Sequence, residues 1–304
     1  MQLLHRRKAF RGTAGVFGFT ITTTATNVTC GFILDVGAGQ SIEVDWGDGS
    51  APDTYSTDGL KTHVYAAAGT RPLTVAGACV SMSWYGIGTT GSLVKGILGL
   101  GSDCSITSGY QMFRVCTGIT GSIPPLPPGL TSATSMFLGC SGLTGAVPTL
   151  PATLQYASYM FHTCSGLTGA VPALPPTLTG ASAMFYYCTG LTGAVPDFPS
   201  SLIYGGNMFA GCSGLTGVVP ALPATLAEAQ YMFFNCTGIA GPLPDMAAAQ
   251  GPLENVNMMF FGCTGLTGNS YPFWDWTDTP AITNGCYENC TNLTDYADIP
   301  AAYK

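Results

Sequence analysis

The sequence predicts a mainly β protein, in which a small β-sandwich precedes a solenoid of about nine 24-residue coils. Residues 16–80 contain short runs rich in β-formers, such as FTITTTA and SIEVDWGDGS, separated by Gly, Asp and Pro turns. Beyond residue 80, a Met-Phe pair followed by a cysteine recurs at a nearly fixed interval, which is typical of stacked repeats. We therefore divide the chain into a basic arm (1–15), a sandwich (16–80) and a solenoid (81–304) whose cap begins at about residue 271 and runs to 304.

Charged residues are scarce and unevenly distributed. They make up 8% of the 304 residues, against about 25% in ordinary soluble proteins. The segment from Met136 to Pro196 contains no Asp, Glu, Lys or Arg, so its surface must be built from Ser, Thr, Tyr and Gly. Such a surface is either a contact surface or covered by a partner. The net charge of −7 disfavours nucleic-acid binding, and no run of about 18 apolar residues predicts a membrane helix.

The first eleven residues carry four of the nine basic side chains, namely Arg6, Arg7, Lys8 and Arg11. No apolar stretch of about 7–15 residues follows them, so the segment is a poor secretory signal. We expect the chain to stay in the cytoplasm or to leave a cell by lysis. We also expect this basic arm to dock onto an acidic partner surface.

The repeat is M-F-x-x-C-x-G-L-T-G-x-V-P-x-L-P. Its Met-Phe pairs begin at 112, 136, 160, 184, 208, 232 and 259, so the spacing is 24 residues five times and then 27. CYENC continues the series with Cys286 in the methionine place, and Met82, at an offset of 30 from Met112, opens an atypical first unit. Terminal repeats are expected to be atypical because they cap the stack.

The repeat resembles two branches of the leucine-rich-repeat family over residues 82–298. MFHTCSGLTGAVP (160–172) is similar to the A-F-x-x-C core of BspA-like, Treponema-type repeats, with Met for Ala. LTGAVP (167–172) resembles the plant-type L-T-G-x-I-P signature. The resemblance implies an arc or straight ladder with a parallel sheet on one face. The first branch would place the strand around YMFHTC and the second at LTGAVP, which we favour.

Eight of the twelve cysteines occupy one place in the repeat: Cys116, Cys140, Cys164, Cys188, Cys212, Cys236, Cys263 and Cys290. The favoured interpretation is an internal ladder of small apolar side chains. Disulfides between rungs about 4.8 Å apart are an alternative, as is a Cys30–Cys79 pair. A metal at CYENC is disfavoured because a zinc site needs about four ligands, so we expect no cofactor.

The first unit contains WGDGS followed by H-x-Y, a pattern that resembles the polycystic-kidney-disease (PKD) type of immunoglobulin-like domain. The matching residues are Trp46, Gly47, Asp48, Gly49, His63 and Tyr65. The resemblance implies an Ig-like sandwich. Two carboxylates beside a histidine could bind a cation or perform acid–base work. A structural role is favoured, because Asp-Gly fixes a tight turn through side-chain-to-backbone hydrogen bonds.

We expect no enzyme activity. The sequence has no P-loop, nucleophile elbow or H-E-x-x-H. Four acidic residues of the solenoid lie at different places in successive coils, which makes a glycosidase pair a weak alternative: Asp197, Glu228, Asp245 and Glu254. In YPFWDWTDTP, Trp274 and Trp276 could stack sugars, but covering the open end of the solenoid is the favoured role.

Chains that combine PKD-like and leucine-rich-repeat segments resemble bacterial and bacteriophage surface proteins. We therefore expect a non-enzymatic structural or binding protein on a bacteriophage virion surface: a capsid decoration, head fibre or tail-associated protein. Its arm would contact other virion proteins of the capsid or tail, and its repeats would face outward or pack on sister copies in a homo-oligomer. The alternative is a bacterial cell-surface adhesin for host protein or glycan. No nucleic-acid or membrane partner is expected.

Overall fold

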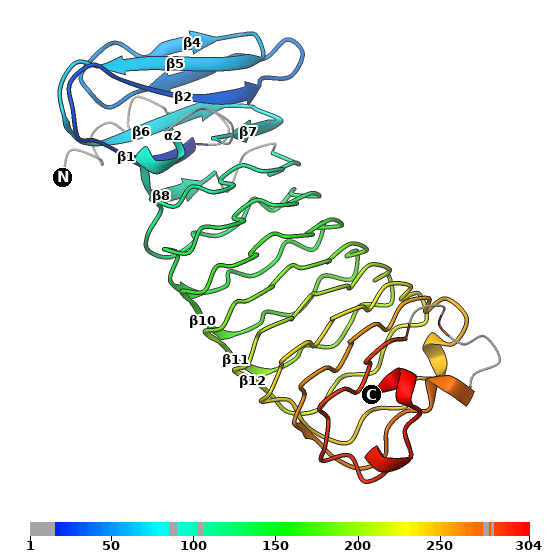
Figure 1. The fold of residues 1–304 in the computed structure, drawn as a ribbon. Coiled ribbons are helices and arrows are strands. Elements are labelled where there is room, and N and C mark those ends of the chain that lie inside the picture. Colours follow the sequence, from blue (N-terminus) through cyan, green and yellow to red (C-terminus); the bar gives the residue numbers. More distant parts are fainter. Residues whose placement is uncertain (1–15, 85–89, 102–105, 276–279, 281–282) are drawn as a thin grey trace.

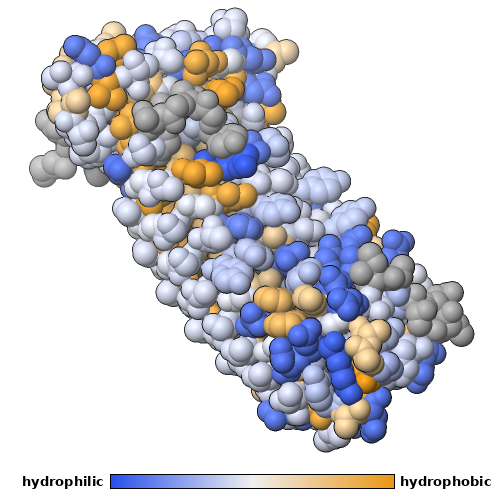
Figure 2. Space-filling model, viewed as in Figure 1, coloured by the Kyte–Doolittle hydropathy of each residue, from blue (hydrophilic) through white to orange (hydrophobic). Residues whose placement is uncertain are grey.

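The computed structural model of the chain describes residues 16–84, 90–101, 106–275, 280 and 283–304. They form a rod, with a two-sheet unit at one end and a stack of similar coils leading to the C-terminus (Figure 1), and the space-filling view has the same outline (Figure 2). Strands dominate, so the prediction of a mainly β chain is confirmed. The described helices are short: α2 (Thr90–Leu93) and the 3-10 helices η1 (Ala247–Ala249), η2 (Phe273–Asp275), η3 (Tyr296–Asp298) and η4 (Ala301–Tyr303). Within the described ranges, no helix has the length and apolar composition needed to span a bilayer.

The two-sheet unit consists of two antiparallel sheets with aromatic side chains between them. The larger sheet has the order β4 (Asp53–Tyr55), β3 (Ile42–Asp45), β6 (Gly69–Gly77), β1 (Val16–Thr23) and β8 (Val94–Leu100). The smaller sheet has the order β5 (Gly59–Tyr65), β2 (Val28–Asp35) and β7 (Ser81–Ser83). Alternation along each strand directs every second residue inward. The ring of Phe32 thereby meets Trp46 at 5.5 Å and Trp84 at 4.8 Å in a fully enclosed core.

This unit extends beyond the boundary expected at residue 80. Strands β7 and β8 complete its two sheets, so it continues to Leu100. Without β8, strand β1 would leave a row of unpaired backbone groups at a sheet edge. The alignment of Met82 with Met112 is also corrected. The amide of Trp84 donates to the carbonyl of Met112 at 2.8 Å, so Trp84, and not Ser83, takes the place that phenylalanine has in later coils.

Both sheets of the unit continue into the repeat region (residues 106–298). Beside β8, the amide of Thr120 donates to the carbonyl of Lys95 at 3.0 Å. Beside β7, Ser81 forms a parallel bridge with Ser108, from which bridges continue through successive coils. The rod is therefore one hydrogen-bonded body in which each sheet of the first unit leads into one side of the coils.

One side of the coils is a ladder of short parallel strands, which we call the strand face. Its strands are β9 (Gly145–Ala146), β10 (Leu167–Ala170), β11 (Leu191–Ala194), β12 (Leu215–Thr216), β13 (Ala240–Gly241) and β14 (Gly265–Leu266). The strand expected at LTGAVP is thus confirmed at its LTGA part. Adjacent coils approach so closely here that a Cβ at Gly190 would collide with the carbonyl oxygen of Leu167.

The opposite side is built from turns rather than strands. In YMFHTC (159–164), the amide of Met160 donates to the carbonyl of Ala157, and the amide of Cys164 donates to that of Phe161, both at 3.0 Å. The third residue of each turn, Tyr159 (φ 60°) or Thr163 (φ 58°), is left-handed, as in type II turns. The same two residues donate their amides to the next coil, to Ser182 at 2.8 Å and to Tyr186 at 2.7 Å. This segment therefore links the coils without being extended.

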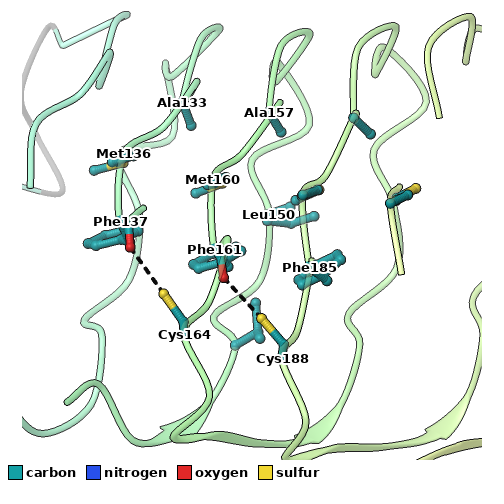
Figure 3. Close-up of a cluster of buried hydrophobic side chains, with 14 of the residues drawn as sticks. Ala133, Met136, Phe137, Leu150, Ala157, Met160, Phe161, Cys164, Phe185 and Cys188 are labelled. Carbon is teal, nitrogen blue, oxygen red and sulfur yellow. Dashed lines mark hydrogen bonds between the residues drawn. The ribbon is translucent and has the colours of Figure 1, made fainter. Parts of the chain in front are cut away.

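Phenylalanines stack along the centre of the coils (Figure 3). Each ring meets the next at 5.4–5.9 Å with interplanar angles of 2–12°. Among the described residues the stack contains eight rings: Phe113, Phe137, Phe161, Phe185, Phe209, Phe233, Phe260 and Tyr287. All are fully buried, beside methionines and cysteines of the same coils. No coil could enclose these rings alone, so stacking provides the core.

The last coil is closed by the C-terminal residues. Cys286 takes the methionine place, because its carbonyl accepts from the amide of Phe260 at 2.9 Å. Gly285 and Tyr287 then donate their amides to Ala302 and Tyr303, at 3.0 and 2.7 Å. Helix η4 therefore satisfies donors that would otherwise form an open edge.

Candidate functional site

The turn side of the middle coils is the candidate binding surface. We call it the turn face and define it as the outward side chains of segments 156–163, 180–187, 204–211 and 228–235. Inward positions of the first of these segments are Ala157, Met160 and Phe161, all fully buried. In the same segment, Ser158, Tyr159, His162 and Thr163 are partly or fully accessible. Figure 2 shows a surface of intermediate hydropathy over the middle of the rod, whereas strongly hydrophilic residues gather toward its C-terminal end.

Aromatic side chains gather on the turn face. The rings of Tyr159 and His162 lie 5.7 Å apart, His162 stacks on Tyr186 of the next coil at 4.5 Å and 13°, and Tyr186 meets Tyr187 at 4.7 Å. We call these four residues the aromatic cluster. Tyr159 is 43% exposed and Tyr187 is 41% exposed. The cluster is therefore one connected aromatic surface that is open to solvent at both ends.

Two tyrosines of this face lie over glycines of the following coil. A Cβ placed on Gly211 would be 3.0–3.1 Å from three ring carbons of Tyr187. A Cβ placed on Gly180 would be 3.5 Å from the Tyr156 ring. Because three adjacent carbons of the Tyr187 ring are almost equidistant from that point, the ring lies flat on the backbone at Gly211.

The aromatic cluster is electrically neutral at neutral pH. The stretch from Met136 to Pro196 has no Asp, Glu, Lys or Arg, so His162 is the one side chain of the cluster that could carry a positive charge. Burial lowers the pKa of His162 below its ordinary value of 6.5. The imidazole is therefore uncharged at pH 7, and a charged ligand would find no counter-charge within the cluster.

The WGDGS turn of the first unit is held together by its own side chains. Asp48 Oδ2 lies 2.7 Å from His63 Nε2, and Asp48 Oδ1 accepts from the amide of Ser50 at 3.0 Å and from its hydroxyl at 2.6 Å. Burial would raise the pKa of Asp48, but the hydrogen bonds from Ser50 and His63 outweigh it and hold that pKa below its usual range. Both carboxylate oxygens are thus engaged by protein groups.

The remaining residues of the motif fix this turn from below. The His63 ring stacks on Trp46 at 5.0 Å, and the Tyr65 hydroxyl donates to the carbonyl of Trp46 at 2.9 Å. Gly47 (φ 76°) is required because a Cβ there would collide with the carbonyl of Pro72, while Gly49 (φ 95°) closes the turn. The turn is therefore a loop held in place by contacts with its own motif residues. In the described parts of the chain, no group of three or more His, Cys, Asp or Glu side chains is placed to hold a metal ion.

The repeated cysteines form a thiol ladder inside the coils. Seven of them donate Sγ–H to a phenylalanine carbonyl of the preceding coil, at 2.9–3.1 Å. Figure 3 shows two of these bonds, from Cys164 to Phe137 and from Cys188 to Phe161. Burial raises the pKa of the Cys164 thiol to about 12. Apart from Cys79, the described cysteines, including Cys30, are free thiols.

The other candidates from the sequence lie apart from the turn-face cluster. Asp197 and Asp245 are exposed residues of the proline-rich loops, and Glu254 is exposed in a later coil, whereas Glu228 lies in the row of bridges that contains Tyr204. Half-buried Trp274 packs edge-on against Tyr303 at 5.3 Å, in the C-terminal cap. Trp276 and the arm residues lie outside the described residues: Arg6, Arg7, Lys8 and Arg11.

Sequence reasoning missed the aromatic cluster. His162 occupies a variable place of the repeat, and the structure stacks its ring on Tyr186. Aligning the repeats by 24 residues puts His162 and Tyr186 in one column, and that column was the available signal. Tyr187 and Gly211 also share one column, but the alignment does not show that the tyrosine ring lies over the glycine.

Comparisons with known proteins add one structural similarity. No protein-family model matches the chain, and no curated protein matches it. The crystal structure of a T. pallidum leucine-rich repeat protein (TpLRR) is similar at a TM-score of 0.40 and 19% sequence identity, covering 71% of this chain and 84% of that one. The fold of the present chain is accordingly defined by its own hydrogen bonds and ring contacts between coils.

Proposed function

We propose that this is a non-enzymatic binding protein whose rod presents the turn face to a partner. The observation that carries the proposal is the aromatic cluster, a set of partly exposed rings in a stretch of the chain, 136–196, that has no charged side chains. Tyrosine supplies a large amphipathic contact area at low entropic cost, while Ser, Gly and Asn supply adaptable hydrogen bonds. The cores of protein interfaces are likewise enriched in tyrosine and depleted of charge.

The turns beneath the cluster support this role because they are preorganised. The amides of Tyr159, Thr163, Ala183 and Tyr187 all donate to the following coil, at 2.7–2.8 Å. A surface fixed in this way loses little conformational entropy when a partner binds, and this small entropic cost favours affinity.

For the fold, we propose that residues 16–100 form a PKD-type Ig-like domain and that about nine coils follow as a leucine-rich-repeat solenoid. The motif turn, with its stacked Trp46 and His63, supports the first part. The ring stack and the LTGA strands support the second.

We place the protein on a bacteriophage virion, as a capsid decoration, head fibre or tail-associated protein. Free buried thiols suit assembly in a reducing cytoplasm. The basic arm would dock on acidic capsid or tail proteins, and the rod would carry the turn face away from that point. A cell-surface adhesin with the same turn face is the competing assignment.

Immunogold electron microscopy of the source culture, with an antibody against the repeat region, tests this location. Gold on phage-like particles is the expected result, together with loss of incorporation when residues 1–15 are deleted. Gold on intact cell envelopes, with no gold on the particles, would contradict the virion assignment and favour the cell-surface adhesin.

The binding role itself is tested by co-sedimentation of purified protein with cells and particles from the same culture. We expect Tyr187→Gly to reduce the bound fraction. Tyr110→Ala is the matched control, because Tyr110 is 54% exposed and lies in the first full coil, outside the cluster. Equal binding by wild type and Tyr187→Gly would contradict the role of the turn face.

A further inference from the structure

We infer that the aromatic cluster of Tyr159, His162, Tyr186 and Tyr187 binds a neutral glycan chain. This inference rests on the proposed binding function and names the ligand class. The ring-to-ring steps of 5.7, 4.5 and 4.7 Å make the cluster a continuous track across two coils. A track of this kind fits an extended chain of sugar rings better than a compact small molecule.

The orientation of Tyr187 favours a sugar ring as its contact. One face of this ring covers the backbone at Gly211, and Tyr187 is still 41% exposed, so part of its side chain is open to solvent. The face of an aromatic ring carries partial negative charge, which attracts the polarised C–H groups on the flat side of a pyranose. Because Gly211 has no side chain, the ring can lie close to the backbone, and its exposed part can contact a sugar.

The charge of the cluster selects among glycans. No Asp, Glu, Lys or Arg lies between 136 and 196, and His162 is neutral at pH 7. An acidic polysaccharide would gain no ion pair here and would be repelled by the net charge of −7. A neutral glycan needs no ion pair and is not repelled by the net charge. Its hydroxyl groups can exchange hydrogen bonds with the three tyrosine hydroxyls and with nearby Ser158 and Ser182.

Affinity electrophoresis of the full chain at pH 7.5 tests this inference. The gels contain dextran, laminarin, galactomannan, xyloglucan or soluble chitin oligomers as neutral probes, and polygalacturonate as the acidic probe. We expect at least one neutral probe, and not polygalacturonate, to retard the wild type. Retardation by none of the neutral probes, or by polygalacturonate alone, would overturn the inference.

Variants of Tyr187 locate the site without disturbing the fold. Tyr187 has φ 54°, and Gly139 and Gly211 occupy the same place in other coils, so Tyr187→Gly removes the ring and keeps a backbone that glycine adopts freely. We expect about tenfold weaker retardation for Tyr187→Gly, by the usual contribution of one aromatic stacking contact. Tyr110→Ala should bind as the wild type does, and Tyr187→Phe, which keeps the ring, should be retarded more strongly than Tyr187→Gly. Equal retardation of Tyr187→Gly, with an unchanged circular dichroism spectrum, would sink the assignment.

The co-sedimentation experiment separates this inference from the proposed function. If Tyr187→Gly loses binding to cells or particles while no neutral glycan retards the wild type, the partner is a protein. The glycan inference then falls and the proposed function stands. If neither assay shows a difference between wild type and Tyr187→Gly, both fall.

Discussion

The phenylalanine stack makes a quantitative prediction about how the coils hold together. Phe185 is fully buried, between Phe161 at 5.6 Å and Phe209 at 5.7 Å. Replacing a buried phenylalanine by alanine costs about 3–5 kcal/mol through lost burial and the cavity left behind. Each aromatic pair that disappears adds about 0.5–1.5 kcal/mol to the loss. Since Phe185 has two such partners, we expect Phe185→Ala to lower the free energy of unfolding by about 4–8 kcal/mol in guanidinium titrations followed by circular dichroism.

A double-mutant cycle isolates the contact between neighbouring rings. Phe161→Ala and Phe185→Ala remove two rings that touch, so their combined effect should deviate from additivity by about 0.5–1.5 kcal/mol. Phe137→Ala and Phe209→Ala remove rings that have no neighbouring ring in common, so their effects should add within about 0.5 kcal/mol. Val218→Ala, exposed on the strand face, is the control and should change stability by less than about 0.5 kcal/mol. The reasoning is refuted if the separated pair couples as strongly as the adjacent pair.

Three further predictions follow from the coils. Gly190→Ala should destabilise the fold by about 1–3 kcal/mol in the same titration, because its Cβ would collide with the carbonyl of Leu167; an unchanged midpoint would contradict this close approach. Burial lowers the pKa of His162, so the unfolded chain takes up a proton more readily, and stability should fall as pH drops below about 6.5. His162→Tyr, which introduces the residue found at this place in the next coil, should reduce the pH dependence of stability in urea titrations at pH 7.5 and 5. An equal loss of stability between the two pH values in wild type and variant would contradict this expectation. Burial raises the pKa of Cys164 and Cys212 to about 12, so the described cysteines should react with Ellman's reagent at pH 8 only after unfolding. Rapid reaction of several thiols in the native protein would contradict the buried ladder.

The sequence was most informative where the repeat is strict. Leu167 and Leu191 recur unchanged beside Thr-Gly, and both lie in short parallel strands as expected. Cys286 could be assigned to the methionine place from spacing alone. Its carbonyl accepts from the amide of Phe260, as the methionine carbonyls of other coils accept from the preceding phenylalanine. A fixed interval predicts which residues stack, because equivalent positions in successive coils must be neighbours.

Conformation was harder to predict than position. YMFHTC reads as a possible strand, yet Tyr159 and Thr163 adopt left-handed φ values that such residues seldom take. Only some coils show glycine there, as Gly139 and Gly211 do, so the turn is not visible in a single repeat. The irregular first unit also hid β8, because VKGILGL carries no repeat signature.

The aromatic cluster was hard to predict for a related reason. Its residues occupy outward positions, where the repeat varies and the pattern carries no information about the core. Their significance comes from contacts between coils, such as His162 on Tyr186 and Tyr187 on Gly211. Those contacts depend on the direction of side chains at turns that the sequence did not predict.

The most direct test of the account is to determine which side of the rod is covered when the protein is bound. Hydroxyl-radical footprinting would compare the free protein with protein attached to the particles or envelopes of the source culture. We predict protection of Tyr159 and Tyr187 on the turn face, while Val218 and Leu98, exposed on the strand face and on β8, stay as reactive as in the free protein. Protection of Val218 and Leu98 with both tyrosines still reactive would show that the opposite face makes the contact, and would contradict the account.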